Sequence, residues 1–137
     1  MTLAIIVRAS FRADSIEFVT PNDNDLQIGY MNRPEGHVIK AHRHLPTRRV
    51  LNSTQEVLMI RSGRIRVDFY DLQEQYLESE MLGQGDLIVL MSGGHGFKVI
   101  EPVDMVEVKQ GPYVAAEDKL FFKGVAEDDV QLVGAAL

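Results

Sequence analysis

Short apolar runs separated by turn-forming residues recur along the body of this chain, and this pattern constrains its fold more than any other feature. The runs are rich in Val, Ile, Leu, Phe and Tyr, and Gly, Pro, Asn or Asp interrupts them. Such a pattern is typical of many short strands in an all-β sandwich or barrel. The expected strands cover residues 3–8, 15–20, 26–32, 37–42, 56–61, 64–70, 76–81, 86–91, 97–100 and 105–110.

Local signals refine this prediction in three places. Ser62-Gly63 favours a tight turn, so residues 56–70 are expected to form a β-hairpin. The stretch 126–133 is left open between a short helix and another strand. Within 64–70 apolar and polar residues alternate, which predicts one buried face and one solvent-exposed face. The first face would hold Ile65, Val67 and Phe69, and the second Arg64, Arg66 and Asp68.

The amino-acid composition limits the partners and the kinds of functional site that this chain can have. The 137 residues suit one compact domain with a sizeable core. The chain carries 14 Lys and Arg against 20 Asp and Glu, a net charge of −6, and this balance argues against nucleic acid as a partner. No Cys is present, which excludes disulfides, thiolate metal sites and a Cys nucleophile. A metal or catalytic site must therefore use the four His and the carboxylates.

No part of the sequence is suited to a membrane. The apolar stretches are far shorter than the roughly 20 residues that a membrane-spanning helix needs. The N-terminal apolar run is short and has no basic region before it, so it is interpreted as a strand rather than a secretory signal. We therefore expect a cytoplasmic protein.

Three histidines and one glutamate form a candidate metal site. His42 and His44 are two residues apart, so on a strand both imidazoles would lie on one face, about 7 Å apart along the backbone. Glu56 opens the next strong strand, and His95 lies in a glycine-rich corner. Three imidazoles and one carboxylate suit a divalent ion such as Zn, Fe, Mn or Ni, with room left for substrate or water. The alternative is that the site is empty.

Glycines at fixed spacings accompany these residues and produce a two-part pattern. The parts are Gly36-x5-His42-x-His44 followed by Glu56-x6-Gly63, and Gly85-x5-Met91-x-Gly93-x-His95-x-Phe97.

This pattern resembles the two motifs of the cupins, and it covers roughly residues 28–110 of a single domain 1–137. The resemblance implies an antiparallel double-stranded β-helix, or jelly-roll, barrel that holds a metal ion in its mouth. It implies His42, His44, Glu56 and His95 as the ligands, with residues 45–55 interpreted as a longer loop. The chain also resembles small single-domain cupins found with bacterial surface-polysaccharide genes.

Three cationic side chains near this site are candidates for substrate binding. Strand parity places Lys40 on the face of the two adjacent histidines, and Arg48 and Arg49 lie in the following loop. Such groups bind carboxylate or phosphate, so they suit an anionic substrate; exposure to solvent is the alternative. Glu107 and Lys109 either line the cavity or form a surface ion pair.

These features favour a small-molecule-binding cupin that acts as a metal-dependent enzyme on a sugar-like or anionic substrate. Isomerisation, epimerisation and oxygenation all remain open. One alternative is a metal-free sugar-nucleotide isomerase or epimerase with a His as base. Another is a non-catalytic ligand-binding module. Cupins usually pair, so a homodimer is expected, and residues 3–8 would either join the partner's sheet or close their own.

Overall fold

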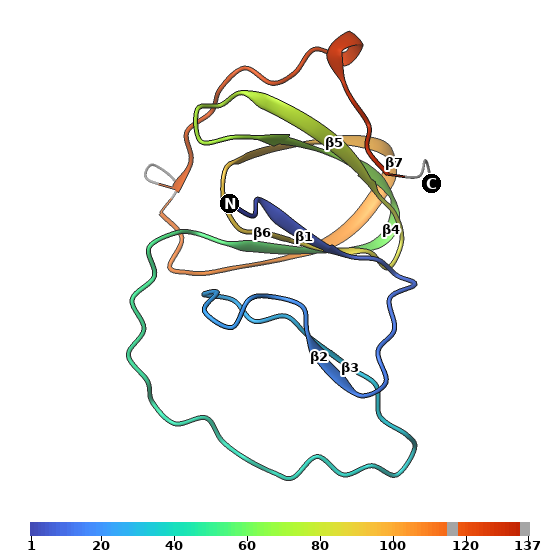
Figure 1. Cartoon of the computed structure of the whole chain (residues 1–137), viewed down its shortest axis with the longest axis vertical. Helices are drawn as coiled ribbons and strands as arrows, with labels where there is room; N and C mark the ends of the chain where they lie inside the picture. The colour runs from blue at the N-terminus through green and yellow to red at the C-terminus, as the bar shows by residue number, and fades with distance from the viewer. Residues whose placement is uncertain (115–117, 135–137) are drawn as a thin grey trace. The chain divides into compact units, whose positions relative to one another are not determined.

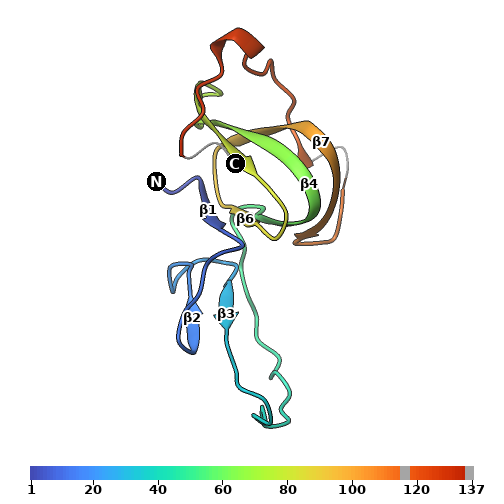
Figure 2. The ribbon, with the colours of Figure 1, turned by 90° about the vertical axis from the view of Figure 1, so that its right-hand side faces the viewer.

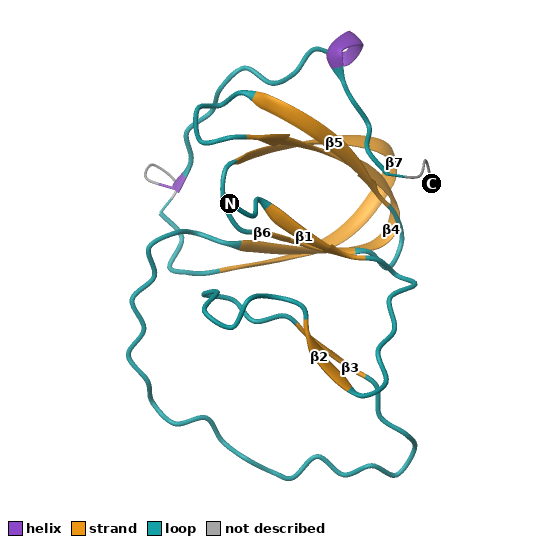
Figure 3. Cartoon of the chain, in the orientation of Figure 1, coloured by secondary structure: helices purple, strands orange, loops and turns teal. Residues whose placement is uncertain are grey.

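The computed structural model describes residues 1–114 and 118–134. The chain divides into two compact units. One unit, the half-barrel unit, comprises Met1–Ala9 and Ser53–Leu137, and the other, the inserted unit, comprises Ser10–Asn52. The regular structure is almost entirely strand (Figure 3), which confirms the all-β prediction. Within the described ranges, no helix has the length and apolar character needed to cross a membrane.

The half-barrel unit is one antiparallel five-stranded sheet that curls on itself (Figure 1). Its strand order is β1-β6-β4-β5, and β7 also pairs with β4. The two longest strands, β4 and β7, run side by side over nearly their whole length (Figure 2). The strands are β1 (Ala4–Val7), β4 (Glu56–Tyr70), β5 (Tyr76–Leu82), β6 (Leu87–Leu90) and β7 (Gly94–Lys109).

The predicted hairpin at Ser62-Gly63 is wrong, because β4 continues through this point as a β-bulge. Its pairing with β7 shifts register on both sides of Ser62, and Gly63 has a φ of 82°. A Cβ on Gly63 would collide with the carbonyl oxygen of Pro102 on β7. Glycine is therefore required for both the backbone conformation and the close strand approach. The strands expected over 97–100 and 105–110 are likewise parts of one strand, β7.

The bulge keeps the core side chains of β4 on one face. Before it the members of the hydrophobic core cluster are at even positions, Leu58 and Ile60, and after it at odd positions, Ile65, Val67 and Phe69. Because side chains alternate along a strand, a bulge is needed to return both sets to the same face. The remaining buried members of this cluster are Leu82, Ile88 and Leu90.

The alternation pattern predicts that the opposite face of β4 is exposed to solvent, and this prediction is wrong at Arg66 and Asp68. The side chains of Arg66 and Asp68 are only 8% and 9% exposed. They form a bidentate pair, with Nε to Oδ1 at 2.7 Å and Nη2 to Oδ2 at 3.0 Å. Ser79 donates a hydrogen bond to Asp68, and Glu127 from the C-terminal segment accepts two from Arg66. The alternation pattern could not reveal this cover, because Glu127 is 61 positions from Arg66 in the chain.

In the C-terminal segment (residues 118–134), the stretch 126–133, left open between a short helix and a strand, forms a single helical turn and an isolated bridge. Glu127–Asp129 forms one turn of 3-10 helix, η1. Leu132 then makes an isolated parallel bridge to Ser79 of β5. Backbone hydrogen bonds on either side of this bridge join Ser79 to Gln131 at 2.9 Å and to Val133 at 3.0 Å. The segment is thereby attached to β5.

The inserted unit is built on a two-stranded antiparallel sheet of β2 (Ile16–Phe18) and β3 (Gly29–Met31). The rings of Phe11 and Tyr30 pack edge to face, with centroids 5.3 Å apart. Residues 35–52 form no strand and are exposed, so the strand predicted over 37–42 is wrong. That segment has the composition of a strand but makes no ladder of hydrogen bonds in the described structure, and alternation alone does not form a sheet. The loop expected over 45–55 is confirmed.

Candidate functional site

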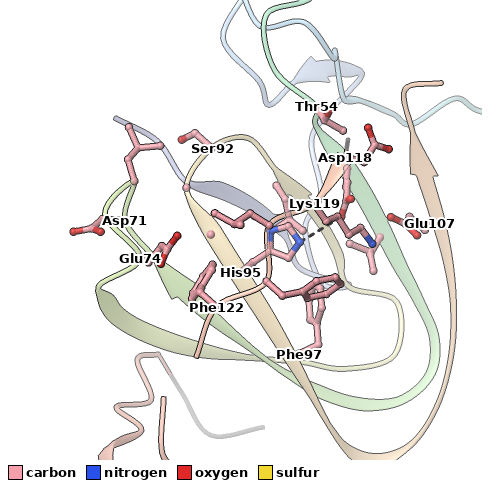
Figure 4. A pocket seen from close by; sticks show the side chains of 18 of the residues that line it. Thr54, Asp71, Glu74, Ser92, His95, Phe97, Glu107, Asp118, Lys119 and Phe122 are labelled. Atoms are coloured by element: carbon pink, nitrogen blue, oxygen red, sulfur yellow. Dashed lines mark ion pairs between the residues drawn. The ribbon is translucent and has the colours of Figure 1, made fainter. Parts of the chain in front are cut away.

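A cavity of about 600 Å³ lies in the half-barrel unit (Figure 4). Side chains from β4, β6 and β7 face this cavity together, because directly paired residues of an antiparallel sheet project from the same face. One cross-strand row joins Ala4, Leu90, Glu56 and Lys109, and the next joins Ile6, Ile88, Leu58 and Glu107. Of these, Glu56, Leu58, Leu90 and Glu107 line the cavity.

Glu56 and His95 meet in this cavity. The Nε2 atom of His95 lies 3.4 Å from Oε2 of Glu56, and the two side chains are 31% and 13% exposed. The other carboxylate oxygen, Oε1, lies 3.8 Å from Nζ of Lys109. That ammonium group also stands over the Tyr113 ring, 5.0 Å from its centroid. Glu56 is therefore held between an imidazole and a cation.

Burial lowers the pKa of the His95 imidazole below its ordinary value, because the charged form loses solvation. The positive charge of Lys119 acts in the same direction. The carboxylates of Glu56 and Glu107 act against both, since negative charge favours the imidazolium ion. The His95 imidazole is thus a weak base that lies among both negatively and positively charged groups.

The rest of the described lining combines apolar surface with carboxylates. Phe97 lies beside His95, with ring centroids 5.5 Å apart, and Phe122 packs against Tyr70 with centroids 5.0 Å apart. Five carboxylates and one lysine contribute to the lining, so its formal charge is negative. Figure 4 shows several of these groups around His95. The charged residues are Glu56, Asp71, Glu74, Glu107, Asp118 and Lys119.

Two of the four predicted metal ligands, Glu56 and His95, are thus brought together. The other two, His42 and His44, belong to the inserted unit, where their rings are neighbours with centroids 5.4 Å apart. The Nδ1 atom of His42 lies 2.8 Å from the carbonyl oxygen of Lys40. If Nδ1 carries the proton, this bond leaves Nε2 as the free lone pair, as in many metal-binding histidines.

The separation of Glu56 and His95 fits two donors to one divalent ion. Two donors bound at about 2.1 Å in tetrahedral geometry lie roughly 3.4 Å apart. Within either unit taken by itself, the described residues contain no group of three or more His, Asp or Glu that could hold a metal ion. The four-ligand site of His42, His44, Glu56 and His95 therefore stays a prediction.

The three predicted substrate-binding residues, Lys40, Arg48 and Arg49, are exposed and belong to the inserted unit. Their contact with a substrate stays a prediction. From the sequence, Glu107 and Lys109 are expected either to line the cavity or to form a surface ion pair. Glu107 lines the cavity, and Lys109 approaches Glu56.

Sequence reasoning missed the contribution of the C-terminal segment. Lys119 and Phe122 line the cavity, although they follow the last expected strand. The only local signal was the apolar triplet Leu120, Phe121 and Phe122 within a polar stretch. Such a triplet predicts burial, but Leu120 and Phe121 are exposed and only Phe122 is partly buried.

Comparison with protein-family models, with curated proteins and with solved structures finds no match to this chain. The cupin resemblance therefore stays a prediction that rests on the two motifs.

Proposed function

We propose that the half-barrel unit binds a small, neutral, polyhydroxylated molecule such as a sugar, and acts on it as an enzyme through His95 and Glu56. The observation that carries this proposal is the 3.4 Å approach of these two side chains inside a cavity of about 600 Å³. Cavities of this size, with apolar walls and a few convergent polar groups, are typical of small-molecule sites.

The lining favours a neutral ligand over an anionic one. Among the described lining residues, five carboxylates face one lysine, so a negatively charged ligand would be repelled. Carboxylate oxygens accept hydrogen bonds from hydroxyl groups, and the rings of Phe97 and Phe122 offer apolar faces to sugar C–H groups. The sugar-like alternative is thus better supported than the anionic one.

The proposed chemistry is proton transfer. The His95 imidazole would take the proton from the carbon next to the carbonyl group of an open-chain sugar and return it to the carbonyl carbon, while the proton of the neighbouring hydroxyl passes to the carbonyl oxygen, and the result is an isomerisation. Glu56 would orient the ring and stabilise the imidazolium ion while it exists. This chemistry is that of the metal-free alternative left open by the sequence, but with His95 as the base and a neutral sugar in place of the sugar nucleotide.

A metal-dependent enzyme is the second candidate, and the donor separation of Glu56 and His95 supports it. When bound, a divalent ion would polarise a substrate oxygen. In either case we propose a cupin-type jelly roll. Its support is the curled antiparallel sheet, in which the Glu56 and Gly63 motif residues lie on β4 and His95 on β7.

Ligand-observed NMR with a panel of neutral monosaccharides, sugar acids and nucleotide sugars tests the proposal. We expect neutral sugars to bind, and the bound sugar to be converted by the wild-type chain. His95→Gln should retain binding and lose roughly a hundredfold or more in turnover. His37→Gln, which changes a histidine outside the lining, should behave as wild type.

Preferential binding of the sugar acids would overturn the neutral-ligand proposal. Binding of neutral sugars without any conversion would indicate the non-catalytic module instead. Turnover that disappears on chelation and returns with a divalent metal would decide for the metal-dependent candidate.

A further inference from the structure

The C-terminal segment connects the cavity to the opposite face of the sheet. Its first part contributes Asp118, Lys119 and Phe122 to the cavity lining. Its later part lies over the face of β4 that carries Arg66 and Asp68, which is opposite the core side chains. One continuous stretch of chain therefore forms a cavity wall and covers the outside of the sheet.

The outer part is held by charge-assisted hydrogen bonds centred on Glu127. Arg66 donates from Nη1 and Nη2 to the two Glu127 oxygens at 3.0 and 3.1 Å. Lys98 of β7 approaches Oε2 of Glu127 at 2.8 Å. We call Arg66, Lys98 and Glu127 the Glu127 clamp. Its arginine is fixed in turn by Asp68, so the clamp has a rigid base and two exposed partners, Lys98 and Glu127.

The part that forms the cavity wall is attached more weakly. The Phe122 ring lies against Tyr70 and so near Gly94 that a Cβ there would come within 2.7 Å of it. The Tyr70 hydroxyl accepts a hydrogen bond of 2.9 Å from the Val125 amide. Leu120 and Phe121 are 79% and 88% exposed. A segment with few buried contacts opens at low free-energy cost, so its closure depends on the anchors that follow it.

We propose that the C-terminal segment is a movable wall of the cavity, that the cavity widens for ligands when this wall lifts away from Tyr70, and that the Glu127 clamp sets how often it lifts. The clamp lies outside the cavity and acts through the chain that joins Glu127 to Phe122. Entry of a ligand rests on the function proposed above. The opening itself does not, because it is a property of the chain without ligand.

Chemical labelling of histidine measures the opening directly. Diethyl pyrocarbonate modifies accessible neutral imidazoles, and peptide mass spectrometry reports each His separately. In Glu127→Gln at pH 7 we expect the modification rate of His95 to rise roughly three- to fivefold, the factor typical of losing a well-formed ion pair. His37, His42 and His44 belong to the inserted unit and should keep their rates, which provides an internal control.

The matched control is Asp128→Asn, which removes the adjacent exposed carboxylate without touching the clamp, and it should leave His95 at the wild-type rate. Lys98→Met removes the second cation of the clamp and should raise the His95 rate by a smaller factor. A second readout uses the absence of Cys from the chain. A single Leu58→Cys reporter, at a lining position that is only 4% exposed, should react faster with a thiol reagent when Glu127→Gln is added.

Equal His95 and reporter rates in wild type and Glu127→Gln would overturn the proposal. An equal rise in Glu127→Gln and Asp128→Asn would also overturn it, since the effect would then follow net charge. These outcomes are separate from the function proposed above. A cavity that opens as described but binds no sugar would leave the movable wall standing and refute the sugar ligand.

Discussion

His95 contacts Glu56 although the two residues are not opposite each other in the strand register. His95 is opposite Phe69 at one end of the β4–β7 ladder, and Glu56 is opposite Lys109 at the other end. In a flat sheet these ends would lie roughly 40 Å apart, at about 3.3 Å per residue. Their side chains are 3.4 Å apart because the sheet curls until the ends of the long strands approach each other. Any change that straightens the sheet should therefore separate the pair.

The bulge in β4 is expected to contribute to the stability of the fold. We expect Gly63→Ala to lower the free energy of unfolding by about 2–4 kcal/mol, because its φ is positive and its Cβ would collide with the Pro102 carbonyl. Gly134→Ala is the matched control. It has a similar φ of 79°, but its Cβ would meet only the flexible end of Glu80. Urea denaturation measures both, and equal losses would show that the strand approach at Gly63 does not contribute.

The buried pair beneath the C-terminal segment should be essential to stability. Arg66→Met leaves the Asp68 carboxylate buried without its cation, which should cost about 3–5 kcal/mol. Arg61→Met provides the comparison on the same strand. Its pair with Asp104 spans 3.7 Å, both side chains are more than half exposed, and its loss should cost less than about 1 kcal/mol. Similar losses in thermal melts of the two variants would contradict the burial of Arg66 and Asp68.

Acid should weaken the Glu127 clamp at an unusually low pH. Hydrogen bonds from Arg66 and Lys98 lower the pKa of Glu127 from 4.5 to about 2. Since the folded pKa is depressed, the stabilisation is complete above pH 4.5 and is lost as the pH falls towards 2. The stability difference between wild type and Glu127→Gln should be constant above pH 5 and shrink below it. A difference that does not change between pH 5 and pH 2 would mean that the clamp does not form.

Metal retention tests the four-ligand prediction. If His42, His44, Glu56 and His95 hold one ion, the purified protein should contain up to one equivalent of Zn, Fe, Mn or Ni by elemental analysis. His42→Ala should reduce that content at least tenfold, whereas His37→Ala should not change it. Wild-type protein that takes up no divalent ion even after incubation with each metal would refute this prediction.

The homodimer stays a prediction as well. Because β1 pairs with β6 of the same chain, residues 3–8 follow the alternative in which they join their own sheet. Light scattering of the purified chain over a range of concentrations measures its mass directly.

The sequence by itself determined the all-β class and most strand positions, because alternation and turn residues are local properties of the chain. The cupin resemblance also predicted that Glu56 and His95 belong to one site, although the strand register does not place them opposite each other. Three features depended on tertiary structure. Only a partner strand shows that Gly63 is a bulge and not a turn, because both need the same backbone freedom. Only the returning C-terminal segment buries Arg66 and Asp68, since alternation records which residues share a face and not what covers it. And only the curl of the whole sheet closes the distance between Glu56 and His95, since the sum of many small strand twists is not encoded at any one position.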